Sequence, residues 1–274
     1  MVTQNDPTLL KGVEAFLFDV FGTVVDWQGS VSKQLSQHYE GLFEIDWIEF
    51  TNEWRAGYMA ATAPQACVAR AVLTNNRFYH GNRKRIAADG SGSTNVDIIH
   101  RELLDEMLAS RKWEHLGKMW GDEKRREINL VWHKLEGWPD SSGGLYSLKK
   151  QAIIGTLSNG NVRLLADMAK FANLPWDVIF SGELIGSYKP NPKVYLGALH
   201  HLSVPPRNCV MVAAHIYDLQ HAALHGMKTV YVRRATEDLD KRDSIKSKAN
   251  GGEVDLVVDS ILELAELFQS SAGL

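Results

Sequence analysis

Short apolar runs alternate with amphipathic stretches over the second half of the chain. The apolar runs predict buried strands at residues 152–157, 177–180, 209–213, 229–232 and 254–258. Apolar residues at helical spacing between them predict helices at residues 161–171, 192–202, 217–225 and 261–268. Strands separated by helices of this length form a parallel sheet that is covered on both faces. The pattern therefore predicts an α/β fold, a Rossmann-like doubly wound parallel sheet.

A further apolar run near the beginning of the chain ends abruptly on a carboxylate. This run starts near Val13 and stops at Asp19, which is followed by Phe21, Gly22 and Thr23. Open α/β sheets bind their ligands at the carboxyl ends of their strands, so a carboxylate at this point is a candidate nucleophile. Two residues later, where a second acid could stand, the chain has Phe21.

Between these two regions the pattern is helical. Residues 29–136 contain no convincing buried strand, and helical spacing occurs at residues 42–61, 96–108 and 125–135. We expect a helical cap domain at residues 29–136, inserted into a core formed by residues 10–28 and 137–270. Five of the eight tryptophans fall in this insertion, where they either line a cleft or form the insertion's own core. Residues 80–93 and 237–253 are polar and predict surface loops.

Composition excludes several classes of function. The chain of 274 residues has 30 Lys and Arg against 33 Asp and Glu, a formal net charge of −3, which argues against a nucleic-acid or membrane-surface partner. No apolar run approaches the roughly 20 residues of a membrane span, and the first residues lack the pattern of a signal peptide. The two cysteines, Cys67 and Cys209, lie far apart and predict ordinary thiols rather than a disulfide. We expect a cytoplasmic protein.

Polar residues follow three further predicted strands or begin the helices after them. Ser158 and Asn159 follow one strand, Lys189 precedes the helix at 192, and His215 and Asp218 follow another strand. Turns after parallel strands open on the same side of the sheet, so these groups are expected around Asp19. A lysine would keep a nucleophilic carboxylate ionised, and hydroxyl and amide donors would suit an anionic substrate. The second acid, Asp218, is suited to positioning water or accepting its proton.

These segments, in this order, resemble the four motifs of the haloacid dehalogenase superfamily. The resemblance covers nearly the whole chain and implies a helical cap inserted after the first motif. Most members of that superfamily are Mg²⁺-dependent phosphatases that use a second aspartate where this chain has Phe21. A phosphatase function is therefore disfavoured.

The sequence is more similar to one branch, the type II (S)-2-haloacid dehalogenases. The resemblance rests on the segments at residues 19–26, 157–160 and 188–195, and on Trp54-Arg55 with Tyr58-Met59 in the cap. It implies Asp19 as nucleophile, Thr23 as its hydrogen-bond partner and Arg55 as halide acceptor. Ser158 and Asn159 would handle the substrate carboxylate and halide, Lys189 and Tyr195 would orient the acid and the substrate, and Asp218 would position the hydrolytic water. The remaining implied substrate-binding positions are Phe21, Met59 and Tyr217.

The implied reaction has two steps and needs neither a metal ion nor a cofactor. Asp19 attacks C2 of a short 2-haloacid, halide leaves toward Arg55, and water then hydrolyses the aspartyl ester to a 2-hydroxy acid with inverted C2. The expected partners are the small haloacid and the halide, and the resemblance also suggests a homodimer.

The fourth motif departs from the pattern of this branch. Ala213 replaces a hydroxyl that would contact the lysine, and His215 replaces an asparagine. His215 either acts in the site, as a hydrogen-bonding group or as a base for the water step, or merely fills the space of the asparagine. Two other functions remain open, a phosphatase with an unusual first motif and a non-catalytic member that keeps the fold.

Overall fold

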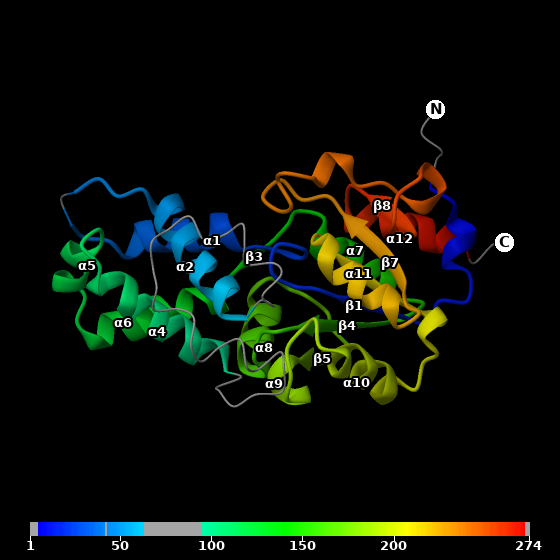
Figure 1. Ribbon diagram of the computed structural model, residues 1–274, viewed down its shortest axis with the longest axis horizontal. Helices are drawn as coiled ribbons and strands as arrows, with labels where there is room; N and C mark the ends of the chain where they lie inside the picture. Colours follow the sequence, from blue (N-terminus) through cyan, green and yellow to red (C-terminus); the bar gives the residue numbers. More distant parts are fainter. Residues whose placement is uncertain (1–4, 42, 63–94, 272–274) are drawn as a thin grey trace.

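The computed structural model describes residues 5–41, 43–62 and 95–271 (Figure 1). Cys67 and the predicted loop at residues 80–93 lie outside the described residues. Cys209 is a buried free thiol. Within the described parts of the chain, no helix is long and apolar enough to cross a membrane.

Six parallel strands form the central sheet, as the sequence predicts. Their spatial order is β5-β4-β1-β6-β7-β8. Their bounds are Ala15–Phe18 (β1), Ile153–Ser158 (β4), Val178–Ser181 (β5), Cys209–Ala213 (β6), Lys228–Val232 (β7) and Leu256–Val258 (β8). β1 is central and pairs with both β4 and β6, so that Leu17 lies between Gly155 and Met211. This arrangement places the residues after β1, β4 and β6 at one edge of the sheet.

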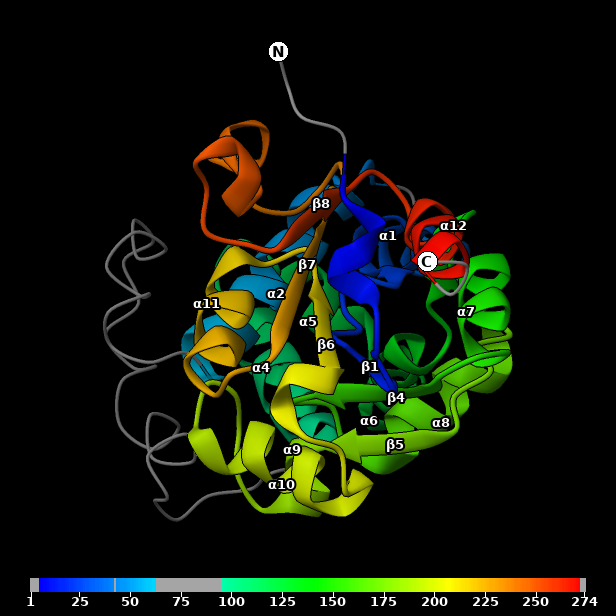
Figure 2. The same ribbon diagram turned by 90° about the vertical axis from the view of Figure 1, so that its right-hand side faces the viewer.

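Helices cover both faces of the sheet (Figure 2). Alternate residues of β1 pack into two separate apolar clusters, Phe16 and Phe18 into one and Leu17 into the other. Because both faces are buried, the strand is apolar at every position rather than at alternate positions. The helices of the core are α7 (Ser141–Lys149), α8 (Val162–Phe171), α9 (Gly182–Ile185), α10 (Pro192–Leu202), α11 (Ile216–Leu224) and α12 (Ile261–Ser271).

Short 3-10 helices occupy several connections. They are η1 (Pro7–Leu10), η3 (Pro206–Asn208), η4 (Arg242–Ser244) and η5 (Lys248–Asn250). The last two lie within residues 237–253, which the sequence predicts to be a surface loop. That prediction is wrong for Glu237, because its side chain is buried and only 7% of the residue is exposed.

The segment inserted between β1 and β4 lies beyond one end of the sheet (Figure 1). It contains α1 (Trp27–His38), α2 (Trp47–Thr62), α4 (Val96–Ala109), α5 (Glu114–Met119), α6 (Asp122–Asn129) and η2 (Leu130–His133). A short antiparallel ribbon of β2 (Val25–Asp26) and β3 (Glu136–Gly137) joins its two ends. We propose that the cap begins and ends at this ribbon, within a few residues of the bounds that the sequence predicts.

Aromatic side chains fill the interior of the inserted segment. Trp54 and Trp132 are fully buried and pack edge to face, with ring centroids 5.5 Å apart. Trp113 and Trp120 contact Phe50 in the same cluster. Trp132 also lies 6.4 Å from the ring of Phe21, so the cluster continues into the loop that follows β1. These tryptophans therefore build the core of the insertion, and one edge of that core meets the candidate site.

Candidate active site

Asp19 lies directly after β1, with its carboxylate fixed from two sides. Lys189 Nζ lies 3.0 Å from Oδ1, and Thr23 Oγ1 donates to Oδ2 at 2.9 Å. The Asp19 residue is only 8% exposed. Burial raises the pKa of Asp19, but the charges and hydrogen bonds of Lys189 and His215 outweigh burial and hold the pKa well below its usual value. The carboxylate is therefore ionised and held in one orientation, as a nucleophile requires.

The turn after β1 accounts for the position of Thr23. Gly22 has a φ of +79°, a conformation that glycine adopts without steric cost, and its N–H donates to the carbonyl of Val25. The hydroxyl of Thr23 accepts a hydrogen bond from the backbone N–H of Ala214 at 2.9 Å. Because that bond occupies the hydroxyl as an acceptor, its proton is free to point at Asp19.

Lys189 connects the nucleophile to a second buried acid. Its ammonium group contacts Asp218 as well as Asp19, and both lysine and acid are almost fully buried. The side chain of Asn159 holds the lysine backbone, since its Oδ1 accepts from the N–H of Lys189 at 2.7 Å and its Nδ2 donates to the carbonyl at 3.3 Å. Asn159 thus fixes the backbone of Lys189 with two hydrogen bonds.

Asp218 lies in the first turn of α11, and its carboxylate accepts hydrogen bonds from two side chains. Tyr195, fully buried on α10, donates to its Oδ1 at 2.5 Å, while Lys189 contacts Oδ2. Burial raises the pKa of Asp218, Lys189 opposes this, and the nearby charge of Asp19 adds to it, so that the pKa lies above its usual value. The two acids therefore differ, with Asp19 the more readily ionised.

His215 contacts the nucleophile at the carboxylate oxygen that Lys189 does not bind. Its Nδ1 lies 3.1 Å from Asp19 Oδ2, and its Nε2 lies 2.9 Å from Oε2 of Glu237. Burial lowers the pKa of His215, but hydrogen bonds to Asp19 and Glu237 outweigh it and raise the pKa to about 10. His215 therefore contacts two carboxylates, and both contacts favour its imidazolium form.

Glu237 is a site residue that the sequence does not reveal. It lies 22 residues beyond His215 in a polar segment, and nothing in its immediate neighbours distinguishes it from a surface acid. Trp27 Nε1 donates to Oε1 of Glu237 at 2.7 Å. The only sequence signal is indirect, since a histidine beside a predicted nucleophile calls for a partner on its other nitrogen.

Arg55 reaches the site from α2 and is 9% exposed. Its guanidinium carbon lies 5.1 Å from the ring centroids of Phe21 and Tyr58 and 5.4 Å from that of Trp27. Nη1 of this guanidinium is buried without a hydrogen-bond partner. A buried cation enclosed by aromatic rings with an unused donor is suited to receive an anion.

The remaining predicted site residues lie around this network. Tyr217 is adjacent to His215, with ring centroids 5.8 Å apart. Ser158 is buried at the end of β4, where its hydroxyl accepts a hydrogen bond from the N–H of Gly160 at 3.2 Å. Met59 is half-buried on α2 and packs against the apolar cluster that contains Phe21.

No group of three or more His, Cys, Asp and Glu side chains among the described residues is arranged to hold a metal ion. At the candidate nucleophile, the ammonium of Lys189 contacts the carboxylates of both Asp19 and Asp218. Neutralisation of charge at this point is therefore provided by a side chain of the protein.

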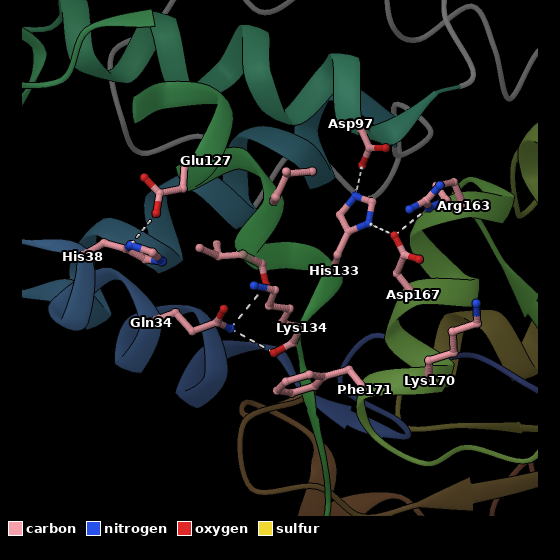
Figure 3. Close-up of a pocket in the computed structure, with 12 residues that line it drawn as sticks. Gln34, His38, Asp97, Glu127, His133, Lys134, Arg163, Asp167, Lys170 and Phe171 are labelled. Atoms are coloured by element: carbon pink, nitrogen blue, oxygen red, sulfur yellow. Dashed lines mark hydrogen bonds and ion pairs between the residues drawn. The ribbon is translucent and has the colours of Figure 1, made fainter. Parts of the chain in front are cut away.

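A hollow of about 630 Å³ lies apart from Asp19, between the inserted segment and α8 (Figure 3). His133 stands at its edge and joins the two parts, with Nε2 3.0 Å from Asp97 on α4 and Nδ1 2.9 Å from Asp167 on α8. None of the predicted site residues lines this hollow. The two ion pairs of His133 therefore connect the inserted segment to α8 of the core.

Comparisons with known proteins agree with this arrangement. The family described as haloacid dehalogenase-like hydrolases matches residues 13–226. The (S)-2-haloacid dehalogenase 1 of Pseudomonas sp. (strain CBS-3) is 34% identical over 225 residues, which cover 81% of this chain and 85% of the relative.

A solved structure of a defluorinating L-2-haloacid dehalogenase is 32% identical, with a TM-score of 0.76, and the match covers 98% of this chain and 100% of that one. A glyceraldehyde 3-phosphate phosphatase of Pyrococcus furiosus is 28% identical, but the match covers only 49% of this chain and 55% of that enzyme. From the extent of these matches and the α/β fold with its inserted helices, the chain belongs to the haloacid dehalogenase-like hydrolases.

Proposed function

We propose that this protein hydrolyses short 2-haloacids to 2-hydroxy acids through an ester formed on Asp19, without a metal ion. Two features of the site together carry the proposal. The carboxylate of Asp19 is ionised and held in place, and the buried guanidinium of Arg55 has an unused donor. The relative named as an (S)-2-haloacid dehalogenase and the solved structure of an L-2-haloacid dehalogenase support it.

In the first step Asp19 attacks C2 of the substrate from the side opposite the halogen. Lys189 and Thr23 hold the carboxylate in place, and Phe21 keeps water from the attacking oxygen. The halide leaves toward Arg55, because a guanidinium cation can bind either a halide or a carboxylate. Attack from the rear inverts the configuration at C2.

In the second step water attacks Cγ of the Asp19 ester. The bond between C2 and the ester oxygen is not broken in this step, so the inverted configuration at C2 is retained in the product. We also propose, from its composition, that the protein is cytoplasmic and, from the resemblance, that it forms a homodimer.

The phosphatase alternative differs in one position of the site. A phosphatase of this superfamily would require a second acid where this chain buries Phe21 against Arg55 and Trp132. The match to the glyceraldehyde 3-phosphate phosphatase covers only 49% of this chain, and position 21 of this chain is not an acid.

The test is multiple turnover with (S)-2-chloropropionate in H₂¹⁸O with EDTA present. We expect chloride release, (R)-lactate as product and ¹⁸O in the peptide that contains Asp19. The Asp19→Asn variant is the control and should release no chloride. Chloride release without label in that peptide overturns the ester mechanism. If no short haloacid yields halide, while a phosphate ester is hydrolysed with Mg²⁺, the phosphatase function replaces this one.

A further inference from the structure

Asp19, His215 and Glu237 form a continuous hydrogen-bonded chain. His215 uses Nδ1 toward Asp19 and Nε2 toward Glu237, at 3.1 and 2.9 Å. Glu237 is held rigidly, because its other carboxylate oxygen accepts from Trp27 Nε1 at 2.7 Å and from Thr236 Oγ1 at 2.9 Å. Such a chain, with an acid behind a histidine, is the arrangement that orients an imidazole for proton transfer.

The backbone makes room for this acid. A Cβ atom at Gly22 would lie 2.4 Å from Cδ of Glu237, so the carboxylate of Glu237 would have to move from its present position. The glycine of the nucleophile turn therefore also permits Glu237 to approach His215. Burial raises the pKa of Glu237, but the hydrogen bond and charge of His215 outweigh it, so the pKa lies below its usual value and the acid is ionised.

The state of His215 depends on the charge of its two neighbours. In the free protein it faces two carboxylates, Asp19 and Glu237, and both favour the imidazolium. Formation of the ester removes the negative charge of Asp19 and its capacity to accept a strong hydrogen bond. The proton that faces Asp19 then loses its partner, while Glu237 still accepts from Nε2. His215 therefore becomes a base with its free nitrogen directed at the ester only after the first step.

The second acid is less suited to this role. Asp218 accepts from Tyr195 on one oxygen and contacts Lys189 with the other. Both of its oxygens are therefore engaged, and neither contact is with His215. Arg55 faces Glu237 from the cap side and stabilises its ionised form.

We propose that His215 is the general base of the ester hydrolysis and that Glu237 is its positioning residue. This inference rests on the proposed function and concerns its second step.

The protons balance over the cycle. On ester formation His215 releases one proton to solvent, which with the departing halide accounts for HX. Water then adds to Cγ of Asp19 and gives one proton to Nδ1 of His215. The tetrahedral intermediate expels the oxygen of the 2-hydroxy acid, which takes up that proton. The remaining proton of the water passes from Asp19 to His215, which restores the imidazolium–carboxylate pair.

The test separates the two steps in the Glu237→Gln variant. A glutamine can donate to Nε2 of His215, which holds the imidazole with its proton on Nδ1 and removes the base. We expect a halide burst of about one equivalent per site, followed by turnover slowed about 100-fold or more, within the range of general-base catalysis. Intact-protein mass spectrometry should show the ester accumulating on Asp19.

The matched control is Asp238→Asn, which removes the same charge one residue further on. Asp238 accepts from the N–H of Ile216 at 2.8 Å and has a φ of +47°, and asparagine tolerates both roles. This variant should hydrolyse the ester at the wild-type rate. His215→Asn should slow ester hydrolysis as Glu237→Gln does, and the double variant should be no slower than either single one, because the two residues act as a unit.

The pH profile of ester hydrolysis provides a readout that a merely structural role would not change. In rapid-quench experiments the inflection for His215 should move to lower pH when the charge of Glu237 is removed. Ester hydrolysis at the wild-type rate in Glu237→Gln, or fully additive effects in the double variant, overturns the inference while leaving the proposed function intact. If the wild-type protein forms no ester, the proposed function and the inference both fail.

Discussion

The ammonium nitrogen of Lys189 lies 3.0 Å from Oδ1 of Asp19 and bridges this carboxylate to Asp218. This buried ammonium group thus holds both acids in place. Removing one partner of a buried ion pair leaves the other charge uncompensated and costs about 3–5 kcal/mol of stability.

We therefore expect Lys189→Ala to lose catalysis and stability together. Without the lysine, Asp19 and Asp218 lie close together and one of them takes up a proton, which removes the nucleophile or disrupts its position. Chloride release should fall at least about 100-fold, within the effect expected of a lost positioning charge. Thermal unfolding should also shift to lower temperature. Lys150→Ala, at an exposed lysine, should change neither measurement.

Arg55→Lys is expected to impair halide departure although it keeps the positive charge. An ammonium group cannot stack between three rings as a planar guanidinium does, and it presents its donors in another geometry. We expect kcat/KM for chloropropionate to fall about 10- to 100-fold, a loss of about 1.4–2.7 kcal/mol in transition-state stabilisation. The measurement is initial-rate chloride release, and Arg111→Lys at an exposed position is the control. An unchanged rate would argue that the halide leaves elsewhere.

Phe21→Asp tests whether the apolar side chain at that position supports dehalogenation. A carboxylate there would lie beside Arg55, pair with the guanidinium and occupy the donor that is unused in the present structure. Chloride release should drop at least about tenfold, whereas Phe21→Leu should retain most of it because the wall stays apolar. Mg²⁺-dependent hydrolysis of a phosphate ester by the wild-type protein would contradict the basis of this prediction.

The His133 bridge predicts a pH-dependent stability. Burial lowers the pKa of His133, but hydrogen bonds to Asp97 and Asp167 outweigh it and raise the pKa above its usual value near 6.5. A group with a raised folded-state pKa contributes its full stabilisation below the unfolded pKa and loses it as the pH rises through the folded pKa.

The His133→Gln variant should therefore unfold at a lower urea concentration than the wild-type protein at pH 6. We expect its free energy of unfolding to be lower by about 1–3 kcal/mol at pH 6, with a smaller difference at pH 9. The control is His200→Gln, at an exposed histidine on α10. A difference that does not change with pH would mean that His133 acts through packing alone.

Much of the core fold was predictable because each of its strands is a short apolar run followed by a turn. Asp19, Ser158 and His215 lie at or next to the ends of such runs, so their meeting at one edge of the sheet follows from the parallel arrangement. The helix α7 was not predicted. It contains Gly143 and Gly144, which favour a loop, but a Cβ at Gly144 would meet the backbone of Ile261 at 2.7 Å, so glycine there allows close packing against α12.

The surroundings of Arg55 and Glu237, by contrast, could not be predicted from the sequence. Local pattern predicts which stretch is a helix, but it does not reveal that three aromatic rings converge on one guanidinium. Glu237 lies among polar residues whose pattern is typical of a surface loop, and its burial depends on donors from Trp27 and His215. Such contacts arise from tertiary folding, and a single sequence carries no local trace of them.

The parts of the site are widely separated along the chain. Lys189 lies 170 residues from Asp19, His215 lies 196 residues from it, and Trp27 is 210 residues from the glutamate that it contacts. During synthesis the nucleophile leaves the ribosome early, while Lys189 and His215, which favour its ionised form, emerge in the last third of the chain. We therefore expect a nascent or truncated chain without that last third to release no halide. Halide release would report only molecules in which these two distant segments have folded together.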